Sequence, residues 1–109
     1  MSYLVGDVTA ADDNARMVET VVVRYGGVEI FLANAGIEDD VASILDYDEA
    51  RFDQVMAVNE KGPFLAVRAA VPAMQVRGGG SIIITSSGSG VRGTPRTAPH
   101  AISKHAVIG

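Results

Sequence analysis

Three side chains near the end of the chain have the types and spacing of a proton-handling site. His100 lies four residues before Lys104 in the segment HAISK, and this spacing brings two side chains to one face of a helix. Ser87 directly follows an apolar run that predicts a buried strand. A hydroxyl, an imidazole and an ammonium group that meet in one place could bind a substrate oxygen and move a proton to or from it.

The same residues also have plain structural interpretations. A lysine on a helix is usually exposed to water, and Ser87 stands in a serine-rich stretch that could be an ordinary turn. We favour the functional interpretation for Lys104 because it shares a helix face with His100, and for Ser87 because it follows a predicted buried strand. No metal site is expected, since His100 and His105 are five residues apart and no cluster of carboxylates accompanies them.

These candidates must be positioned by a small set of strands and helices. Continuous apolar runs predict buried strands at residues 2–5, 28–33 and 81–86. Helices are expected over residues 10–25, over residues 49–76 and from about Pro99 onward. Buried strands that alternate with helices are typical of a parallel α/β sheet covered by helices on both faces.

The ends of the predicted helices carry recognisable signals. Thr9 can cap the first helix, and Gly26 is a typical residue to end it. Asp46 or Asp48 can cap the long helix. The glycines at 78–80 predict a turn between the long helix and the last strand.

The carboxyl ends of the predicted strands are where a ligand is expected, because ligands of such sheets bind beyond those ends. Here they are Asp7, the segment ANAG at 33–36 and Ser86–Ser87. The segment GSGVRG at 88–93 matches the pattern of a dinucleotide phosphate loop. That loop requires a helix to begin at its last glycine, whereas threonine and proline follow here. We interpret residues 88–93 as a loop without a phosphate-binding role.

The composition narrows the class of protein. The chain has 109 residues, enough for one domain, with a net charge of −4 and no cysteine. The negative charge gives no reason to expect nucleic acid or an anionic membrane as a partner, and the lack of cysteine suits a reducing cytoplasm. No apolar run is long enough to span a membrane, and the first residues show no signal-peptide pattern. We therefore expect a cytoplasmic protein.

Five motifs along the chain resemble those of the classical short-chain dehydrogenase/reductase family. They are, in order, DVT at 7–9, ANAG at 33–36, VNEKGPF at 58–64, GGGSIIITSS at 78–87 and HAISK at 100–104. The resemblance implies a Rossmann-type, doubly wound parallel sheet. It also implies hydride transfer between NAD or NADP and an alcohol or carbonyl substrate, and a dimer or tetramer for the full-length protein.

The cofactor-binding residues that the resemblance implies are Asp7, Val8, Asn34, Ala35, Gly36 and Lys104. Asp7 matches the aspartate that hydrogen-bonds the adenine amine, with the backbone of Val8 beside it. Residues 34–36 match the segment that lines the cofactor cleft, in which Ala33 replaces the usual first asparagine. Lys104 matches the lysine that binds the nicotinamide ribose.

The resemblance also implies four catalytic positions: Asn59, Ser87, His100 and Lys104. Asn59 matches the catalytic asparagine, and its place on an apolar helix stripe predicts that its amide points toward the core. Such an amide could be purely structural, since a buried amide must be hydrogen-bonded. Because Pro63 lacks an N–H, the carbonyl of Asn59 loses its helical donor, and we expect a water there. Ser87 matches the serine that binds the substrate oxygen.

His100 stands at the position of the family's catalytic tyrosine. A neutral imidazole is a fair base but a poor acid, so alcohol oxidation should survive better than carbonyl reduction. The imidazole also extends less far from the backbone than a phenol does. Ser87 and His100 would therefore be poorly placed to hydrogen-bond the same substrate oxygen. We therefore predict an impaired or inactive catalyst. One base separates tyrosine and histidine codons, so a sequencing error or a recent mutation stays an alternative.

Several parts of the family pattern have no counterpart in the 109 residues. The TGxxxGxG turn, the first two strands, the substrate loop and the C-terminal strands are missing. We therefore expect residues 1–109 to be an internal fragment of one NAD(P)-binding Rossmann domain, from its third strand to the start of the lysine-bearing helix, and to fold poorly alone. The expected function is that of an NAD(P)-dependent oxidoreductase. The alternatives are a catalytically silent nucleotide-binding or scaffold protein and a non-functional gene fragment.

Overall fold

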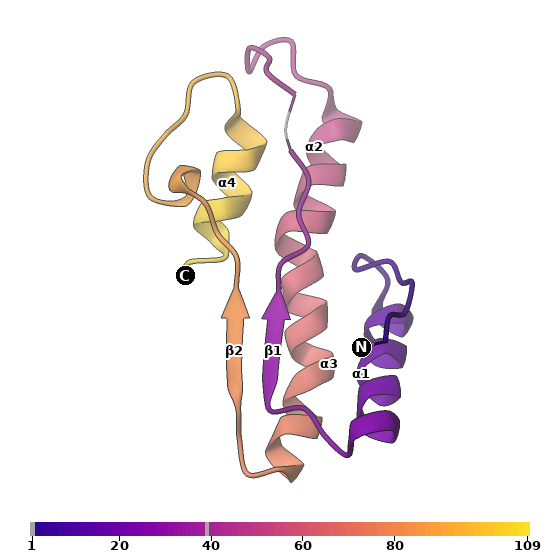
Figure 1. Ribbon diagram of the computed structural model, residues 1–109. Coiled ribbons are helices and arrows are strands. Elements are labelled where there is room, and N and C mark those ends of the chain that lie inside the picture. Colours follow the sequence, from indigo (N-terminus) through magenta and orange to yellow (C-terminus); the bar gives the residue numbers. More distant parts are fainter. Residues whose placement is uncertain (1, 39) are drawn as a thin grey trace.

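The computed structural model describes residues 2–38 and 40–109. Its helices and strands are, in chain order, α1 (Ala11–Tyr25), β1 (Ile30–Ala33), α2 (Glu49–Met56), α3 (Gly62–Val76), β2 (Ser81–Ile84) and α4 (Ala98–Ala106) (Figure 1). A π-helical turn, η1 (Ala57–Lys61), joins α2 to α3, and a short 3₁₀ turn, η2 (Gly88–Gly90), follows β2. The long helix predicted over 49–76 is thus continuous but contains a π-helical turn at Asn59 and its neighbours.

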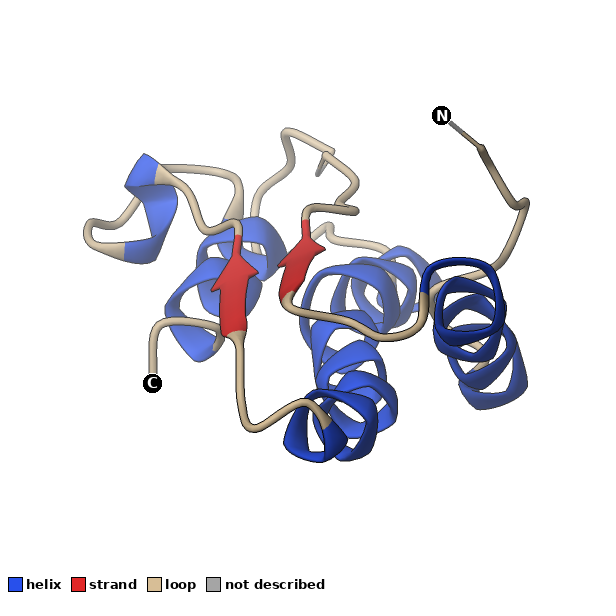
Figure 2. Ribbon diagram, turned by 60° about the horizontal axis from the view of Figure 1, so that its bottom comes forward, coloured by secondary structure: helices blue, strands red, loops and turns tan. Residues whose placement is uncertain are grey.

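The two strands form a parallel pair. Their register runs from Ile30 opposite Ser81 to Ala33 opposite Ile84, and the helical segment from α2 to α3 connects them. The N–H of Thr85 donates to Ala33 O over 3.0 Å, so the pairing continues one residue beyond the strands. Figure 2 shows the strands side by side, with helices packed behind and below them. The carboxyl ends of the two strands therefore meet at one edge, as predicted.

The two faces of β1 have different surroundings. Phe31 is half-buried and packs against the core, whereas Ile30 and Leu32, on the opposite face, are 71% and 57% exposed. The alternation follows from strand geometry, because successive side chains point to opposite faces. Within residues 2–38 and 40–109, helices cover only one face of the two strands. The sequence pattern predicted helices on both faces of the sheet.

The first predicted strand, residues 2–5, is not formed. These residues have no strand partner in the described chain, and Tyr3 and Val5 are 90% and 80% exposed. A strand is stable only when its backbone groups are paired with a neighbour, and here the carbonyl of Val5 is bonded by the side chain of Arg16 instead. The strand prediction at residues 2–5 is therefore wrong for this structure.

The core lies between α1, α3 and β1. α1 ends at Gly26, whose φ of 87° is the left-handed conformation that favours glycine. α3 ends in the predicted glycine turn, where Gly78 and Gly79 also have positive φ. The side chains buried together between these elements are Val18, Val28, Ala70 and Met74.

The predicted helix caps are confirmed in part. Asp48 caps α2, since its carboxylate accepts the N–H of Arg51 at 2.9 Å. The N-cap of α1 is Ala10 rather than Thr9. The hydroxyl of Thr9 donates to Asp7 Oδ1 and is therefore engaged away from the helix.

Candidate active site

A cleft of about 260 Å³ lies where both strands end. It is lined by Gly36–Glu38 after β1, by Ser86–Ser87 after β2, and by His100 and Lys104 on α4. The structure thus brings together four of the predicted site residues from three separate segments: Gly36, Ser87, His100 and Lys104.

Lys104 is buried, with 6% of its surface exposed. Its Nζ donates to Thr85 O at 3.0 Å, and Ser86 Oγ donates to the backbone oxygen of Lys104 at 2.8 Å. Thr85 and Ser86, which follow β2, therefore fix the ammonium group and the backbone of Lys104, respectively. Burial lowers the pKa of Lys104 below its ordinary value. The interpretation of Lys104 as a water-exposed helix lysine is therefore wrong.

Asn59 is 1% exposed, and its amide points inward as predicted. Oδ1 accepts the N–H of Ile37 at 2.8 Å, and Nδ2 donates to Ile37 O at 3.0 Å. Nδ2 also lies 3.3 Å from Ser103 Oγ, to which it donates. The side chain thus pairs with the backbone of Ile37 as a neighbouring strand would, and it fixes the segment that follows β1.

Gly36 places bare backbone next to these groups. A Cβ on Gly36 would lie 3.4 Å from Asn59 Oδ1 and 3.5 Å from Lys104 Nζ. Any larger residue would therefore fill the space beside the ammonium group. The cleft consequently offers a buried cation beside backbone that a flat ligand could approach closely.

Ser87 is exposed at the start of η2. Its Oγ accepts the N–H of Ser89 at 3.2 Å. A hydroxyl that accepts a hydrogen bond retains its own proton for donation. Ser87 is therefore both a turn residue and a side chain able to donate to a ligand in the cleft.

His100 is half-buried in the first turn of α4, and it lines the cleft together with Lys104. Its backbone oxygen accepts a hydrogen bond of 2.9 Å from Ser103 Oγ. His105 is exposed, and its Nδ1 lies 2.8 Å from Ala101 O. His105 therefore lies at a solvated position of α4.

The remaining predicted cofactor residues lie away from this cleft. Val8, Asn34 and Ala35 contribute to a second cavity of about 230 Å³ that is mostly lined by apolar side chains. Asn34 Oδ1 accepts a hydrogen bond from Thr85 Oγ1 at 2.8 Å, which ties the two strand ends together. Asp7, the residue before Val8, is exposed.

Segment 88–93 behaves as the sequence context predicted. Only the short turn η2 forms there, and the next helix begins at Ala98. Gly90 is buried because this turn lies directly on α4: a Cβ on Gly90 would lie 2.6 Å from Lys104 O. These glycines therefore serve close packing at the site.

The roles of two polar residues of the site were not predicted, although Ser86 was placed at a strand end. Ser103 is fully buried and joins Asn59 to His100 O through its hydroxyl. Ser86 holds the backbone of Lys104. The sequence contains only a weak signal for these contacts. A serine beside a candidate residue also fits an ordinary turn or an exposed helix position.

Residues 2–38 and 40–109 contain no group of three or more His, Cys, Asp or Glu side chains able to hold a metal ion. None of the helices in these ranges combines the length and the apolar character needed to cross a bilayer.

Comparison with known protein families matches residues 1–109 to the family described as short chain dehydrogenase. The chain belongs to this family. Human dehydrogenase/reductase SDR family member 4 is 38% identical over 99 residues, which are 91% of this chain and 36% of that protein. The family that the five motifs indicated is thereby confirmed.

Solved structures of short-chain enzymes show the same fold. Levodione reductase superposes with a TM-score of 0.94 at 31% identity, covering 97% of this chain and 41% of that one. NAD⁺-bound xylitol dehydrogenase superposes with a TM-score of 0.93 at 32% identity, covering 96% and 40%. The Rossmann-type fold is thus confirmed. The chain spans well under half the length of each of these relatives.

Proposed function

We propose that this chain supplies the active site of an NAD(P)-dependent oxidoreductase that transfers hydride between a nicotinamide cofactor and an alcohol or carbonyl substrate. One observation carries the proposal. Ser87, His100 and Lys104 line one cleft where the two parallel strands end. This is where ligands of such sheets bind.

The cleft fits a nicotinamide nucleotide. The bare backbone of Gly36 lies beside the buried Nζ of Lys104, which can donate to ribose hydroxyl groups. NAD⁺ is bound in the xylitol dehydrogenase that shares this fold, which supports the same class of cofactor here. When bound, the cofactor would supply or accept the hydride. Asp7 and residues 34–36 would hold its other parts.

Each polar residue then has a role in the reaction. Ser87 donates a hydrogen bond to the substrate oxygen, and His100 takes the proton from an alcohol or returns it to a carbonyl. Lys104 orients the ribose and places a positive charge beside the reacting oxygen. Asn59 acts through the backbone of Ile37, which positions Gly36. Because neutral imidazole is a better base than acid, alcohol oxidation is the favoured direction.

His100→Tyr tests this proposal in the protein expressed as its gene encodes it. With secondary alcohols, ketones and either cofactor, we expect wild type to oxidise better than it reduces. The variant should gain at least about 100-fold in reductive kcat/KM, because the phenol reaches the substrate oxygen and is a better proton donor. His105→Tyr, on the exposed side of α4, should change neither direction. The proposal fails if wild type binds neither NAD nor NADP.

A catalytically silent nucleotide-binding or scaffold protein is the second candidate. It is favoured by His100 at the tyrosine position and by Asn59, whose amide is fully engaged with Ile37 and Ser103. Cofactor binding without turnover in both wild type and His100→Tyr would favour it. A cytoplasmic location and a dimeric or tetrameric assembly remain part of the leading proposal, and light scattering of the purified protein tests the assembly.

A further inference from the structure

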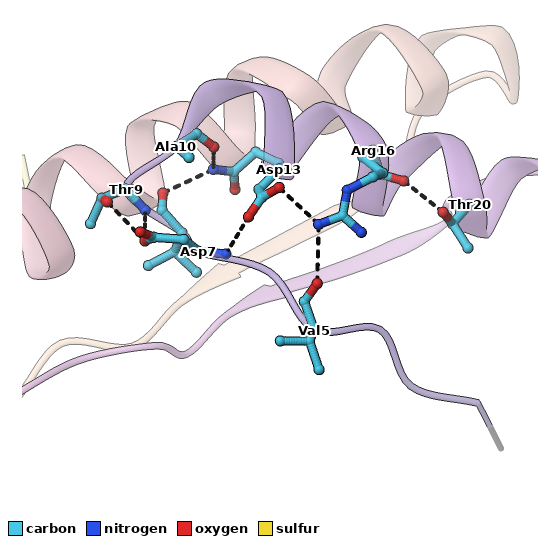
Figure 3. A network of polar contacts seen from close by, with 9 residues as sticks. Val5, Asp7, Thr9, Ala10, Asp13, Arg16 and Thr20 are labelled. Atoms are coloured by element: carbon cyan, nitrogen blue, oxygen red, sulfur yellow. Dashed lines mark hydrogen bonds and ion pairs between the residues drawn. The ribbon is translucent and has the colours of Figure 1, made fainter.

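The segment that contains Asp7 is held by side chains of α1 rather than by a strand partner (Figure 3). The N–H of Asp7 donates to Asp13 Oδ2 at 2.7 Å. Arg16 Nη2 donates to Asp13 Oδ1 at 2.8 Å and to Val5 O at 3.1 Å. One carboxylate and one guanidinium of α1 therefore hold the backbone on both sides of residue 6.

Local hydrogen bonds then set the direction of the Asp7 side chain. Its Oδ1 accepts both the N–H and the hydroxyl of Thr9, each at 2.8 Å, which forms an Asx turn. The N–H of Ala10 donates to Asp7 O at 3.1 Å. The exposed carboxylate of Asp7 is thus oriented through its Oδ1.

α1 transmits this position to the rest of the fold. Asn14, 2% exposed, donates through Nδ2 to Val8 O at 2.9 Å and to Ala10 O at 2.8 Å. Val18 packs into the core against α3. Asp7 and Val8 are therefore placed relative to α3 by side chains of α1.

We propose that Asp13, held by Arg16, is a positioning residue that orients Asp7 toward the adenine end of a bound dinucleotide. The proposal rests on the proposed function and on the match of Asp7 to the family's adenine-binding aspartate. Asp13 is ionised at neutral pH, as an ordinary aspartate is, and its hydrogen bonds with Arg16 and the N–H of Asp7 lower its pKa further. A charged acceptor strengthens the bond to the backbone.

Asp13→Ala tests the role in binding, with Asp12→Ala as its matched control. Asp12 is exposed in the same first turn, so both variants remove one negative charge near the same helix N-terminus. Fluorescence titration with NADH or NADPH, whichever binds wild type, should show Kd raised about three- to tenfold in Asp13→Ala only. Reduced nicotinamide mononucleotide, which lacks the adenine half, should bind wild type and both variants equally.

Two results of this titration would overturn the proposal. One is an equal rise of Kd in Asp12→Ala, which would show a general effect of charge. The other is an equal weakening of dinucleotide and mononucleotide by Asp13→Ala, which would show a general loss of structure.

NMR of the Asp7 amide tests the contact without any cofactor. Its proton shift should follow the titration of Asp13 at a pH below the ordinary aspartate range, and Asp13→Ala should remove that component. The carboxylates of Asp7 and Asp12 remain in the variant, so the difference belongs to Asp13. An amide shift with no such component would overturn the contact. If the component is present but wild type binds no dinucleotide, the proposed function fails, and Asp13 has only a structural role.

Discussion

The polar residues of this chain are positioned in two different ways. At the ends of the strands, Asn59, Ser103 and Lys104 are nearly fully buried and are bonded across elements that are far apart in the sequence. Around Asp7, the carboxylates and the guanidinium of Arg16 are exposed or half-buried, and they bond groups at most 11 residues away in the sequence. The first region is built into the core, and the second is attached to its surface.

The two groups of residues therefore contribute differently to the stability of the fold and to the orientation of side chains. A buried group that loses its partner costs roughly 1–3 kcal/mol, so residues of the first region hold the fold as well as the site. Exposed ion pairs contribute little to stability and are screened by salt. The residues around Asp7 therefore direct a side chain without strengthening the fold much.

Asn59→Leu should break the first region most severely. The substitution removes three hydrogen bonds and leaves both backbone groups of Ile37 without that partner, so we expect a loss of about 3 kcal/mol in the free energy of unfolding. Urea denaturation of the protein expressed as its gene encodes it, followed by circular dichroism, measures this loss. Asn34→Leu, at an exposed position with one side-chain bond, should cost less than about 1 kcal/mol. Equal losses would show that burial does not distinguish the two amides.

Gly90→Ala should loosen the contact between η2 and α4. The new Cβ would lie 2.6 Å from Lys104 O and 2.9 Å from Ile108 Cδ1, so the turn must move, at a cost of about 2 kcal/mol. The same denaturation experiment detects the change. Gly93→Ala is the matched control, because a Cβ there meets nothing within 4 Å. A neutral Gly90→Ala variant would show that η2 does not press on α4.

Lys104→Met should change how stability depends on pH. The pKa of Lys104 is lower in the folded chain than in the unfolded one, so the unfolded chain holds its proton more strongly. The stability of wild type should therefore rise with pH between the folded-state pKa and the ordinary lysine value, about 10.4. The stability of Lys104→Met relative to wild type should fall over the same range. Parallel pH profiles of the two melting temperatures would contradict this.

Arg16→Met should have the smallest effect on stability. The pair with Asp13 is solvent-accessible, so the melting temperature should fall slightly, and the difference from wild type should vanish in about 0.5 M salt. Thermal unfolding at low and high salt measures this. A large loss that persists in high salt would show that the region around Asp7 is part of the core.

Much of the local structure could be predicted from residue types. The apolar runs at 28–33 and 81–86 contain β1 and β2, Asp48 caps α2, and Gly26 ends α1. These features depend on nearby residues, so the sequence shows their causes. The strand predicted at residues 2–5 failed because a strand also requires a neighbour.

The candidate site divides in the same way. The order of strands and helices places Ser87, His100 and Lys104 near the ends of the strands, and the spacing of four residues puts His100 and Lys104 on one face of α4. The partners of these residues could not be predicted. Lys104 Nζ donates to Thr85 O because α4 packs against the turn that follows β2. Ile37 pairs with Asn59 because the crossover from β1 to β2 passes beside the end of β1.

The sequence by itself determined the family, the alternation of elements and the residue types of the site, since motifs and periodicity are local properties. Only the tertiary structure decided which polar side chains are buried and what they bond. Ser103 shows why: a serine beside a lysine has no preferred environment until α4 packs against η1. The packing then removes water from Ser103 and Asn59 together, and each becomes the partner that the other needs.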